Sequence, residues 1–290
     1  MGLRLKFNLV LLAVFVTGLA VTGYISYELL HRNAREEVLR NAGVMMEAAL
    51  SMRSYTVGQV RPNLAVDPDK FLPQSVPAFG ATEIMTLLRK KYPDYSYKEA
   101  ALNPTNPRNR AVEWETDIVN VFRGDPARAE ISGMRETPTG RSLYLARPFQ
   151  VKDPACLACH TTAEMAPASM VKIYGPSNGF GWKLNEVIGA QIVSVPMDLP
   201  IRNADRAFRT FMGSLAAVFA VLFVILNVML TLLIVRPITT LSHAAEQISK
   251  GKLDIAELPE KGRDEVSQLG QAFNRMRRSL EKAISLIDKN

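Results

Sequence analysis

Two long apolar runs that contain no charged residue divide the chain. The first extends from Phe7 to Tyr27 and the second from Thr210 to Val235. A helix needs roughly 20 apolar residues to cross about 30 Å of hydrocarbon, and each run is long enough. The length of the second run disfavours a buried core helix of a soluble protein. We therefore predict two transmembrane helices in a lipid bilayer.

The two predicted spans define four segments. They are an N-terminal anchor over residues 1–27, a central domain over 28–209, a second transmembrane helix over 210–235 and a tail over 236–290. A cleaved signal peptide is the alternative for the first run, with 18-GLA-20 as a weak cleavage site. If both spans are real, the two termini lie on the same side of the membrane.

Beyond the second span the apolar spacing becomes helical. A first series has spacings of 3 or 4 and contains Ile238, Leu241, Ala245 and Ile248. An extended connector follows, with Gly251, Leu253, Ile255 and Leu258. A second series alternates spacings of 3 and 4 and contains Val266, Leu269, Phe273, Met276, Leu280, Ala283 and Ile287. This strict heptad order predicts a coiled-coil seam.

Two short helices joined by a connector of this length resemble a HAMP region. The residues that carry the resemblance are Pro237, Gly251 and the pair Asp264-Glu265. The resemblance implies a homodimer in which a parallel four-helix bundle couples a membrane span to a cytoplasmic output. A plain amphipathic coiled coil is the alternative. No kinase, cyclase or receptor tip follows, so we expect either a separate cytoplasmic signalling partner or a truncated chain.

The central region alternates helical and strand patterns, which predicts an α+β fold. We expect one long helix from the first span to about residue 60 and further helices over 81–92 and 111–122. Strands are expected over 95–102 and 186–197, and a hairpin over 129–151 turns at Thr137-Pro138-Thr139-Gly140. Strands around a central helix, attached to a long N-terminal helix, are typical of PAS- or CACHE-like sensor domains.

The charge balance gives no indication of nucleic-acid binding. The chain has 35 Lys and Arg against 28 Asp and Glu, a net charge of +7. This excess is spread thinly, and no segment forms a basic patch. We also find no catalytic constellation, and we do not expect an enzyme.

The two cysteines of the chain, Cys156 and Cys159, occur in the stretch 156-CLACH-160. A thioredoxin-like redox pair is disfavoured because the βαβ context is missing, and a zinc site is disfavoured because no second Cys or His pair exists. A structural disulfide remains an alternative. The spacing fits covalent attachment of one haem c, with His160 as the axial iron ligand.

Haem attachment would also determine the topology of the chain. Haem c is attached outside the cytoplasm, so the central domain is expected in the periplasm and both termini in the cytoplasm. Arg4 and Lys6 before the first span favour a cytoplasmic N-terminus, whereas Arg202, Arg206 and Arg209 before the second span argue weakly the other way. We therefore predict a bacterial inner-membrane protein with two spans.

Several further phrases resemble a bacterial family of periplasmic c-type haem sensor domains with a PAS-like core. These phrases are 53-RSYTVGQVRPNL-64, 78-AFGATEIM-85, 104-PTNPRNRAVEWE-115, 156-CLACHTT-162, 173-IYGPSNGFGW-182 and 188-IGAQIVSVPM-197. The resemblance covers about residues 30–200. It implies redox or gas sensing, with Cys156 and Cys159 as attachment points and His160 as axial ligand.

The second axial position is left open by the sequence. A described family member uses a cysteine of the N-terminal helix, but this chain has no third cysteine. Methionines near that position are the candidates: Met45, Met46 and Met52, with Met165 and Met170 as rivals. An open position is the other alternative. Arg53 and Tyr55 are candidates for the haem pocket.

Two classes of function remain for such a protein. One is a transmembrane haem sensor that responds to iron redox state or to a gas ligand such as NO, CO or O2. The other is a membrane-anchored periplasmic cytochrome that exchanges electrons with a redox partner. The HAMP-like tail favours the sensor, because an electron carrier has no need of a cytoplasmic relay.

Overall fold

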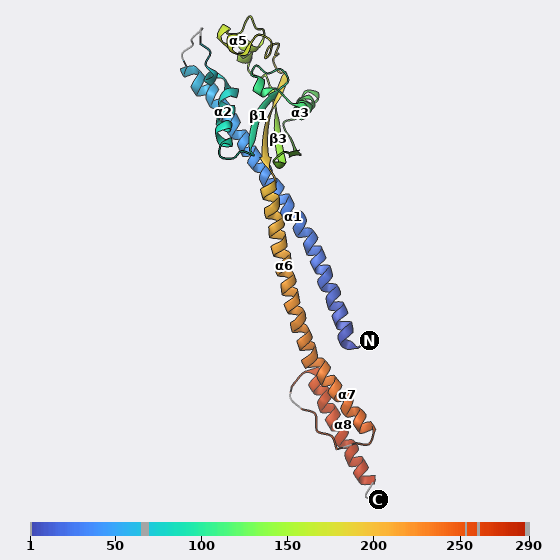
Figure 1. Cartoon of the computed structure of the whole chain (residues 1–290). Coiled ribbons are helices and arrows are strands. Elements are labelled where there is room, and N and C mark those ends of the chain that lie inside the picture. Colours follow the sequence, from blue (N-terminus) through green and yellow to red (C-terminus); the bar gives the residue numbers. More distant parts are fainter. Residues whose placement is uncertain (1, 65–69, 253, 260–261, 288–290) are drawn as a thin grey trace. The chain divides into compact units, whose positions relative to one another are not determined.

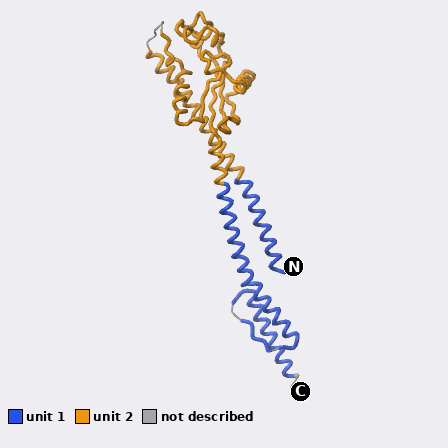
Figure 2. The backbone as a smooth tube through the Cα atoms, viewed as in Figure 1, with its two compact units in different colours: residues 1–26, 208–290 blue, residues 27–207 orange. Residues whose placement is uncertain are grey.

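The computed structural model describes residues 2–64, 70–252, 254–259 and 262–287. The chain forms two compact units (Figure 2): residues 1–26 with 208–290, and residues 27–207. The expected connector residue Leu253 and the last three residues of the tail lie outside the described part.

Within the described residues, two helices are long and apolar enough to cross a membrane. Helix α1 spans Leu3–Tyr55 and helix α6 spans Asp198–Met229, which a short π-helical segment, Leu230–Val235, continues. Their apolar segments are in contact, because the Phe15 and Phe219 rings stack with centroids 4.7 Å apart. Many large apolar side chains on both helices are exposed, as lipid-facing residues would be, among them Val10, Leu12, Val14, Val221, Val224 and Val228.

The second unit is built around one four-stranded antiparallel sheet (Figure 1). Its strands are β1 (Ser96–Ala101), β2 (Ile131–Thr137), β3 (Gly140–Gln150) and β4 (Val187–Pro196), in the order β1-β4-β3-β2. Strand β4 therefore lies between β1 and β3, and its residues up to Val195 are buried. This accounts for its nearly continuous apolar sequence, since a central strand covered on both faces has no solvent side.

Helices cover both faces of this sheet. One core cluster joins α1 and α2 (Pro77–Arg89) to it, and its buried residues include Val38, Ala42, Met46, Ala49, Ala81, Met85, Leu145 and Val193. The second cluster joins α3 (Glu113–Gly124) to the other face and includes Ile118, Val119, Phe122, Ala190 and Ile192. The members on α1 are spaced by 3 or 4 residues, which places them on one side of that helix.

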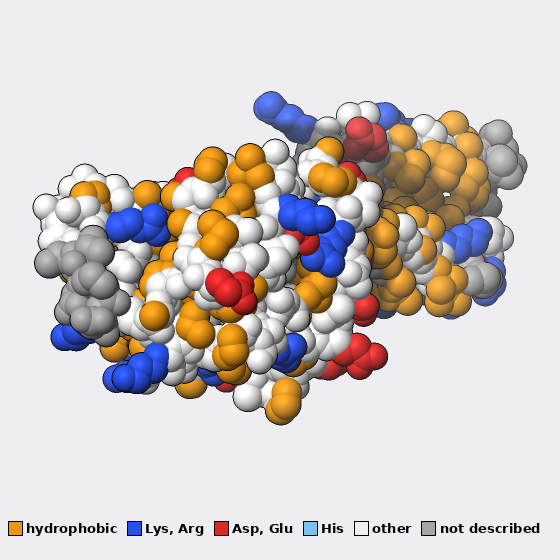
Figure 3. Space-filling view, turned by 90° about the horizontal axis from the view of Figure 1, so that it is seen from above, with side chains coloured by type: hydrophobic (Ala, Val, Ile, Leu, Met, Phe, Trp, Pro, Cys, Tyr) orange, Lys and Arg blue, Asp and Glu red, His pale blue; other side chains and the backbone are white. Residues whose placement is uncertain are grey.

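The remaining elements of this second unit are short. They are the π-helical turn η1 (Thr56–Val60), the 3₁₀ turns η2 (Arg61–Asn63), η3 (Pro73–Ser75), η4 (Pro107–Asn109) and η5 (Pro154–Cys156), and the helices α4 (Leu157–His160) and α5 (Ala168–Tyr174). On the face drawn in Figure 3, basic and acidic side chains alternate with apolar ones rather than forming one field of a single sign.

The tail consists of α7 (Arg236–Ser249) and α8 (Glu265–Ile287). Gly251 follows α7 with φ of 81°, a conformation that favours glycine, and Asp264 caps α8 by accepting a hydrogen bond from Ser267 N at 2.7 Å. Asn274 is buried and holds the connector, because its side chain bonds both the N–H and the C=O of Leu258. The motif residues Gly251 and Asp264 thus define helix ends.

The sequence-based expectations for the two apolar helices and for the central domain are confirmed. The fold is α+β with two long apolar helices flanking the central domain, and the strands, the hairpin and the three long helices of that domain occur where the patterns predict them. The boundaries differ by a few residues. Helix α2, for example, begins at Pro77 rather than 81, because proline is well tolerated in the first turn of a helix.

Gly189 provides a test of how β1 and β4 pair. A β-carbon at this position would lie 2.3 Å from the Ala100 carbonyl oxygen, whereas one at Gly43 on α1 would meet nothing within 4 Å. We predict that Gly189→Ala lowers the free energy of unfolding by about 1–3 kcal/mol through overpacking. Gly43→Ala, the matched control, should raise it by about 0.5–1 kcal/mol. Chemical denaturation in detergent measures both, and a neutral Gly189→Ala would contradict the pairing.

Candidate functional site

The segment that holds the two cysteines is a compact double turn. Asp153 starts it by accepting a hydrogen bond from Ala155 N at 2.9 Å, and turn η5 leads directly into helix α4. Cys156 and Cys159 are half-buried and are not joined by a disulfide. Both thiols and the imidazole of His160 therefore lie on one short turn of chain.

The surroundings of the two thiols favour their protonated form. Burial raises the pKa of both, and at Cys156 the nearby Asp153 carboxylate raises it further, although the Arg53 and Arg61 guanidinium groups oppose this. A redox-active Cys-X-X-Cys pair normally has a lowered thiol pKa. Among the described residues, no group of three or more His, Cys, Asp or Glu side chains could hold a metal ion.

His160 is held in one orientation by its Nδ1 atom. This atom lies 2.7 Å from the Gly179 carbonyl oxygen, which accepts a hydrogen bond, so the proton belongs on Nδ1. The Nε2 atom is then left as the basic nitrogen. Burial lowers the pKa of His160, although the Gly179 carbonyl opposes this, so the imidazole is neutral near pH 7. A neutral imidazole whose other nitrogen is anchored by a carbonyl is the usual form of a metal-ligating histidine.

A glycine-rich loop returns the chain to His160. Gly181 N donates to Thr161 O at 2.9 Å, and Trp182 N donates to His160 O at 3.2 Å. Gly179 has φ of 85°, and its N–H is bonded to Asn103 Oδ1 at 3.2 Å. The loop thereby places the Trp182 indole parallel to the His160 ring, with centroids 3.8 Å apart and planes at 13°.

Aromatic contacts connect His160 to the end of helix α1. The Phe149 ring meets Trp182 edge to face, with centroids 6.2 Å apart. The Arg53 guanidinium carbon lies 4.7 Å from the Phe149 ring centroid, within the range of a cation–π interaction. A continuous series of contacts therefore runs from His160 through Trp182 and Phe149 to Arg53.

Arg53 is also half of a buried ion pair. Its Nη1 donates to both oxygens of Glu99, at 2.7 and 2.5 Å, and the exposed fractions of the two side chains are 19% and 2%. Tyr97 donates a third hydrogen bond to Glu99 at 2.8 Å. Burial alone would lower the pKa of Arg53, but Glu99 outweighs it and the pKa is raised. Burial and the Glu99 charge both raise the pKa of Tyr97, so its hydroxyl stays protonated.

The structure brings some of the predicted site residues together and not others. Arg53 lies near Cys156, but its charge is taken up by Glu99. Tyr55 is 55% exposed. Met46 is fully buried in the core beneath the sheet, and Met45 and Met52 pack against the same core. Of the rival methionines, Met165 is exposed and Met170 is buried in α5.

Among the residues that shape the site, Glu99, Phe149, Gly179 and Trp182 were not predicted as site residues. For Gly179 and Trp182, the signal was the phrase 173-IYGPSNGFGW-182, whose glycine spacing indicates a loop of unusual backbone conformation before a tryptophan. A sequence does not indicate that this loop folds back on His160, because the contact depends on the whole sheet.

The profile of the Tll0287-like family matches residues 31–196, more than half of the chain. This chain belongs to the Tll0287-like family. A HAMP domain profile matches residues 229–282, which confirms the expected order of a sensor-family domain followed by HAMP. No curated protein matches the chain. Among solved structures, it is similar to the crystal structure of the cyanobacterial heme protein Tll0287, with 16% identity and a TM-score of 0.45 over 55% of this chain and 95% of that one.

The Arg53–Glu99 pair in the Tll0287-like domain yields a quantitative prediction. Glu99→Gln leaves a buried guanidinium without its counter-charge, which should cost about 3–5 kcal/mol of unfolding free energy. Glu47→Gln is the matched control: Glu47 pairs with Arg147 at 2.6 Å but is 62% exposed, so its loss should cost less than about 1 kcal/mol. Denaturant unfolding followed by tryptophan fluorescence checks both, and equal costs would contradict a special role for the buried pair.

Proposed function

We propose that this protein is a membrane-anchored haem c sensor that passes its signal through a HAMP dimer to a cytoplasmic partner. In this proposal, residues 28–209 are periplasmic, residues 1–27 and 210–235 cross the inner membrane, and the tail is cytoplasmic. The observation that carries the proposal is the arrangement at Cys156, Cys159 and His160, in a Tll0287-like chain followed by a HAMP domain.

The residues of the site have the donor set that a covalently bound haem requires. Two unbridged thiols, protonated near neutral pH, stand three residues apart on one turn. The adjacent imidazole has its Nδ1 proton held by Gly179 and its Nε2 available as a ligand. Cys156 and Cys159 would hold the haem by thioether bonds, and His160 would be the axial ligand.

A bound haem would supply an iron centre that changes its charge with redox state and that can take up a small gas. The chain's own residues determine how that centre is presented. Gly179 fixes the imidazole tautomer, and the Trp182 ring prevents the imidazole from rotating. Met46 and Met170 are buried and Met45 and Met52 pack against the core, so we infer weak or absent ligation in the second axial position.

The series of contacts from His160 to Arg53 supports a route for the signal. Arg53 lies near the end of α1, a helix that continues without a break from the first apolar run. A displacement of the His160 ring would shift Trp182 and Phe149, and it would thereby change the position of Arg53 relative to Glu99. Such a change has to favour one of two packings of the helix for a signal to pass.

The seam of α8 supports dimerisation. Among its described residues, the seam members Leu269, Met276 and Leu280 are exposed in the single chain. Burying them against a second copy would gain about 25 cal/mol for each Å² of apolar surface removed from water. Asn274 lies off this seam and is used to hold the connector within the chain.

Covalent attachment can be tested by mass spectrometry. Protein made with a cytochrome c maturation system should carry one haem mass that survives denaturation. Cys156→Ser together with Cys159→Ser should lose that mass, because thioether bonds then cannot form. Tyr92→Phe, which changes an exposed side chain outside the predicted site, should keep it. Retention of the haem mass in the double serine variant would refute attachment at these residues.

Signalling can be tested by disulfide crosslinking. In haem-loaded protein the native cysteines are consumed, so Met276→Cys places one reporter on the expected seam. We predict rapid crosslinking between two copies, with a rate that changes when the haem is reduced or binds CO. Ser285→Cys, on the opposite side of α8, should crosslink slowly in every state.

Two outcomes would count against the relay. A Met276→Cys chain that never crosslinks would exclude the parallel dimer. Crosslinking at one rate in every haem state would exclude signalling through the tail and favour the electron-transfer cytochrome instead.

A further inference from the structure

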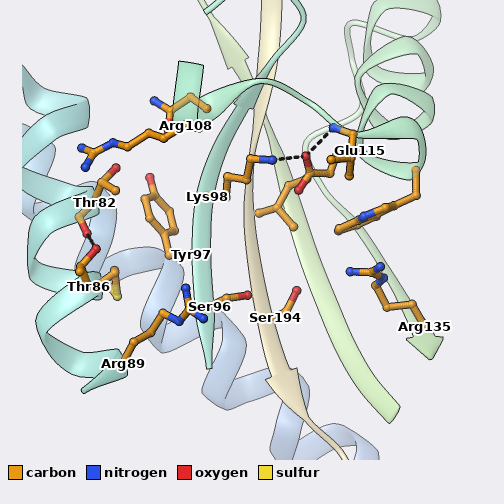
Figure 4. Close-up of a pocket in the computed structure, with 15 residues that line it drawn as sticks. Thr82, Thr86, Arg89, Ser96, Tyr97, Lys98, Arg108, Glu115, Arg135 and Ser194 are labelled. Atoms are coloured by element: carbon orange, nitrogen blue, oxygen red, sulfur yellow. Dashed lines mark hydrogen bonds and ion pairs between the residues drawn. The ribbon is translucent and has the colours of Figure 1, made fainter. Parts of the chain in front are cut away.

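A polar groove lies beside the edge strand β1, and none of its lining residues belongs to the cysteine segment (Figure 4). Its volume is about 500 Å³, and it is lined by α2, β1, the segment from η4 to α3, β2 and β4. Ligand sites in proteins commonly occupy 300–1,000 Å³. The groove is therefore large enough for a small molecule, and neither the haem proposal nor the HAMP relay uses it.

The charges that line the groove favour an anion. Four side chains are basic and one is acidic: Arg89, Lys98, Arg108 and Arg135 against Glu115. Lys98 donates to Glu115 at 2.6 Å, and Arg108 donates to Glu83 at 2.8 Å, so these two cations are neutralised. Within the described part of the chain, no carboxylate contacts Arg89 or Arg135. Two guanidinium groups in the groove are thus without a counter-charge.

Arg135 is already held in a binding orientation. Its guanidinium carbon lies 4.0 Å from the centroid of the Trp114 ring, which is itself in contact with Tyr144. Stacking of this kind occupies the flat face of the guanidinium and leaves its N–H edge available for a bidentate acceptor. Figure 4 shows Arg89 and Arg135 on opposite sides of strand β1.

Two serine hydroxyls lie between these guanidinium groups. Ser96 of β1 and Ser194 of β4 face each other across the strand pair and both line the groove. Neither hydroxyl has a hydrogen-bond partner among the residues that the structure describes. Because a serine hydroxyl is a donor, both are available to an incoming oxygen anion.

We propose that this groove binds a small organic dicarboxylate. One carboxylate would be bound by Arg135 and the other by Arg89, with the serine hydroxyls donating between them. A dicarboxylate fits better than a monocarboxylate because the two unpaired cations come from different walls. It also fits better than an acidic peptide strand, because one end of the β1 edge is already occupied: Ala111 N donates to Ala101 O at 2.9 Å.

The test is titration calorimetry on the full chain in detergent, with succinate and glutarate as probes. We expect saturable binding of at least one of them, and weaker binding of butyrate, of inorganic phosphate and of a short acidic peptide. Arg135→Gln and Arg89→Gln should each lower the affinity for the dicarboxylate by about tenfold or more, since each removes a charge-assisted contact. Arg135→Lys should lower the affinity less than Arg135→Gln does, because lysine keeps the positive charge but lacks the planar guanidinium that can bind both carboxylate oxygens.

Arg128→Gln is the matched control, because Arg128 is exposed, pairs with Asp125 at 3.2 Å and does not line the groove. It should leave the affinity unchanged, which rules out an effect of net charge. Circular dichroism verifies that each variant is folded.

Absence of binding by the folded chain, stronger binding of the peptide, or equal affinities in wild type and both glutamine variants would overturn the proposal. Repeating the titration with Cys156→Ser and Cys159→Ser together separates it from the haem proposal, since dicarboxylate binding should persist.

Discussion

The ion pair between Arg53 and Glu99 is the interaction on which the rest of the central domain depends. It joins the end of a long helix to the edge strand of the sheet, and both charges are largely removed from water. Desolvation offsets much of the attraction in such a pair, so its net contribution to stability is modest. The pair matters more for the position of the helix than for net stability, because an unpaired charge buried at this place would destabilise the fold. The helix therefore has one rotation about its own axis in which its apolar side packs against the sheet and Arg53 pairs with Glu99.

The apolar side of α1 and this ion pair are parts of one pattern. Ala42, Met46 and Ala49 are fully buried, and Arg53 follows Ala49 at a spacing of four residues. The helix thus presents a packed core along the sheet and then a charge at its end. Because Arg53 also covers Phe149, the same setting supports the Trp182 ring on which His160 is stacked. The orientation of the imidazole is in this sense a property of the helix as well as of its own loop.

The sequence predicts the features that depend on interactions between residues close together in the chain. The two apolar runs, the hairpin at Thr137–Gly140, the heptad seam of α8 and the Cys-X-X-Cys-His segment are all patterns within one stretch of chain. The order of the strands is different, because β4 is last in sequence but lies between β1 and β3. Glu99 is 46 positions from Arg53, and Trp182 reaches His160 only through the returning loop. Such contacts depend on which distant segments pair, and no short-range periodicity encodes that choice.

The groove and the cysteine segment are connected through the same buried pair. Tyr97 and Met85 line the groove, and both belong to the core that packs against α1. Tyr97 also donates to Glu99, which in turn binds Arg53. A ligand that moved Tyr97 would therefore act on the same helix end that the proposed displacement of His160 would reach. Any coupling between the two sites must be reciprocal, because each can alter the affinity of the other only by the same factor. Helix α1 would then respond to the combination of both inputs rather than to either alone.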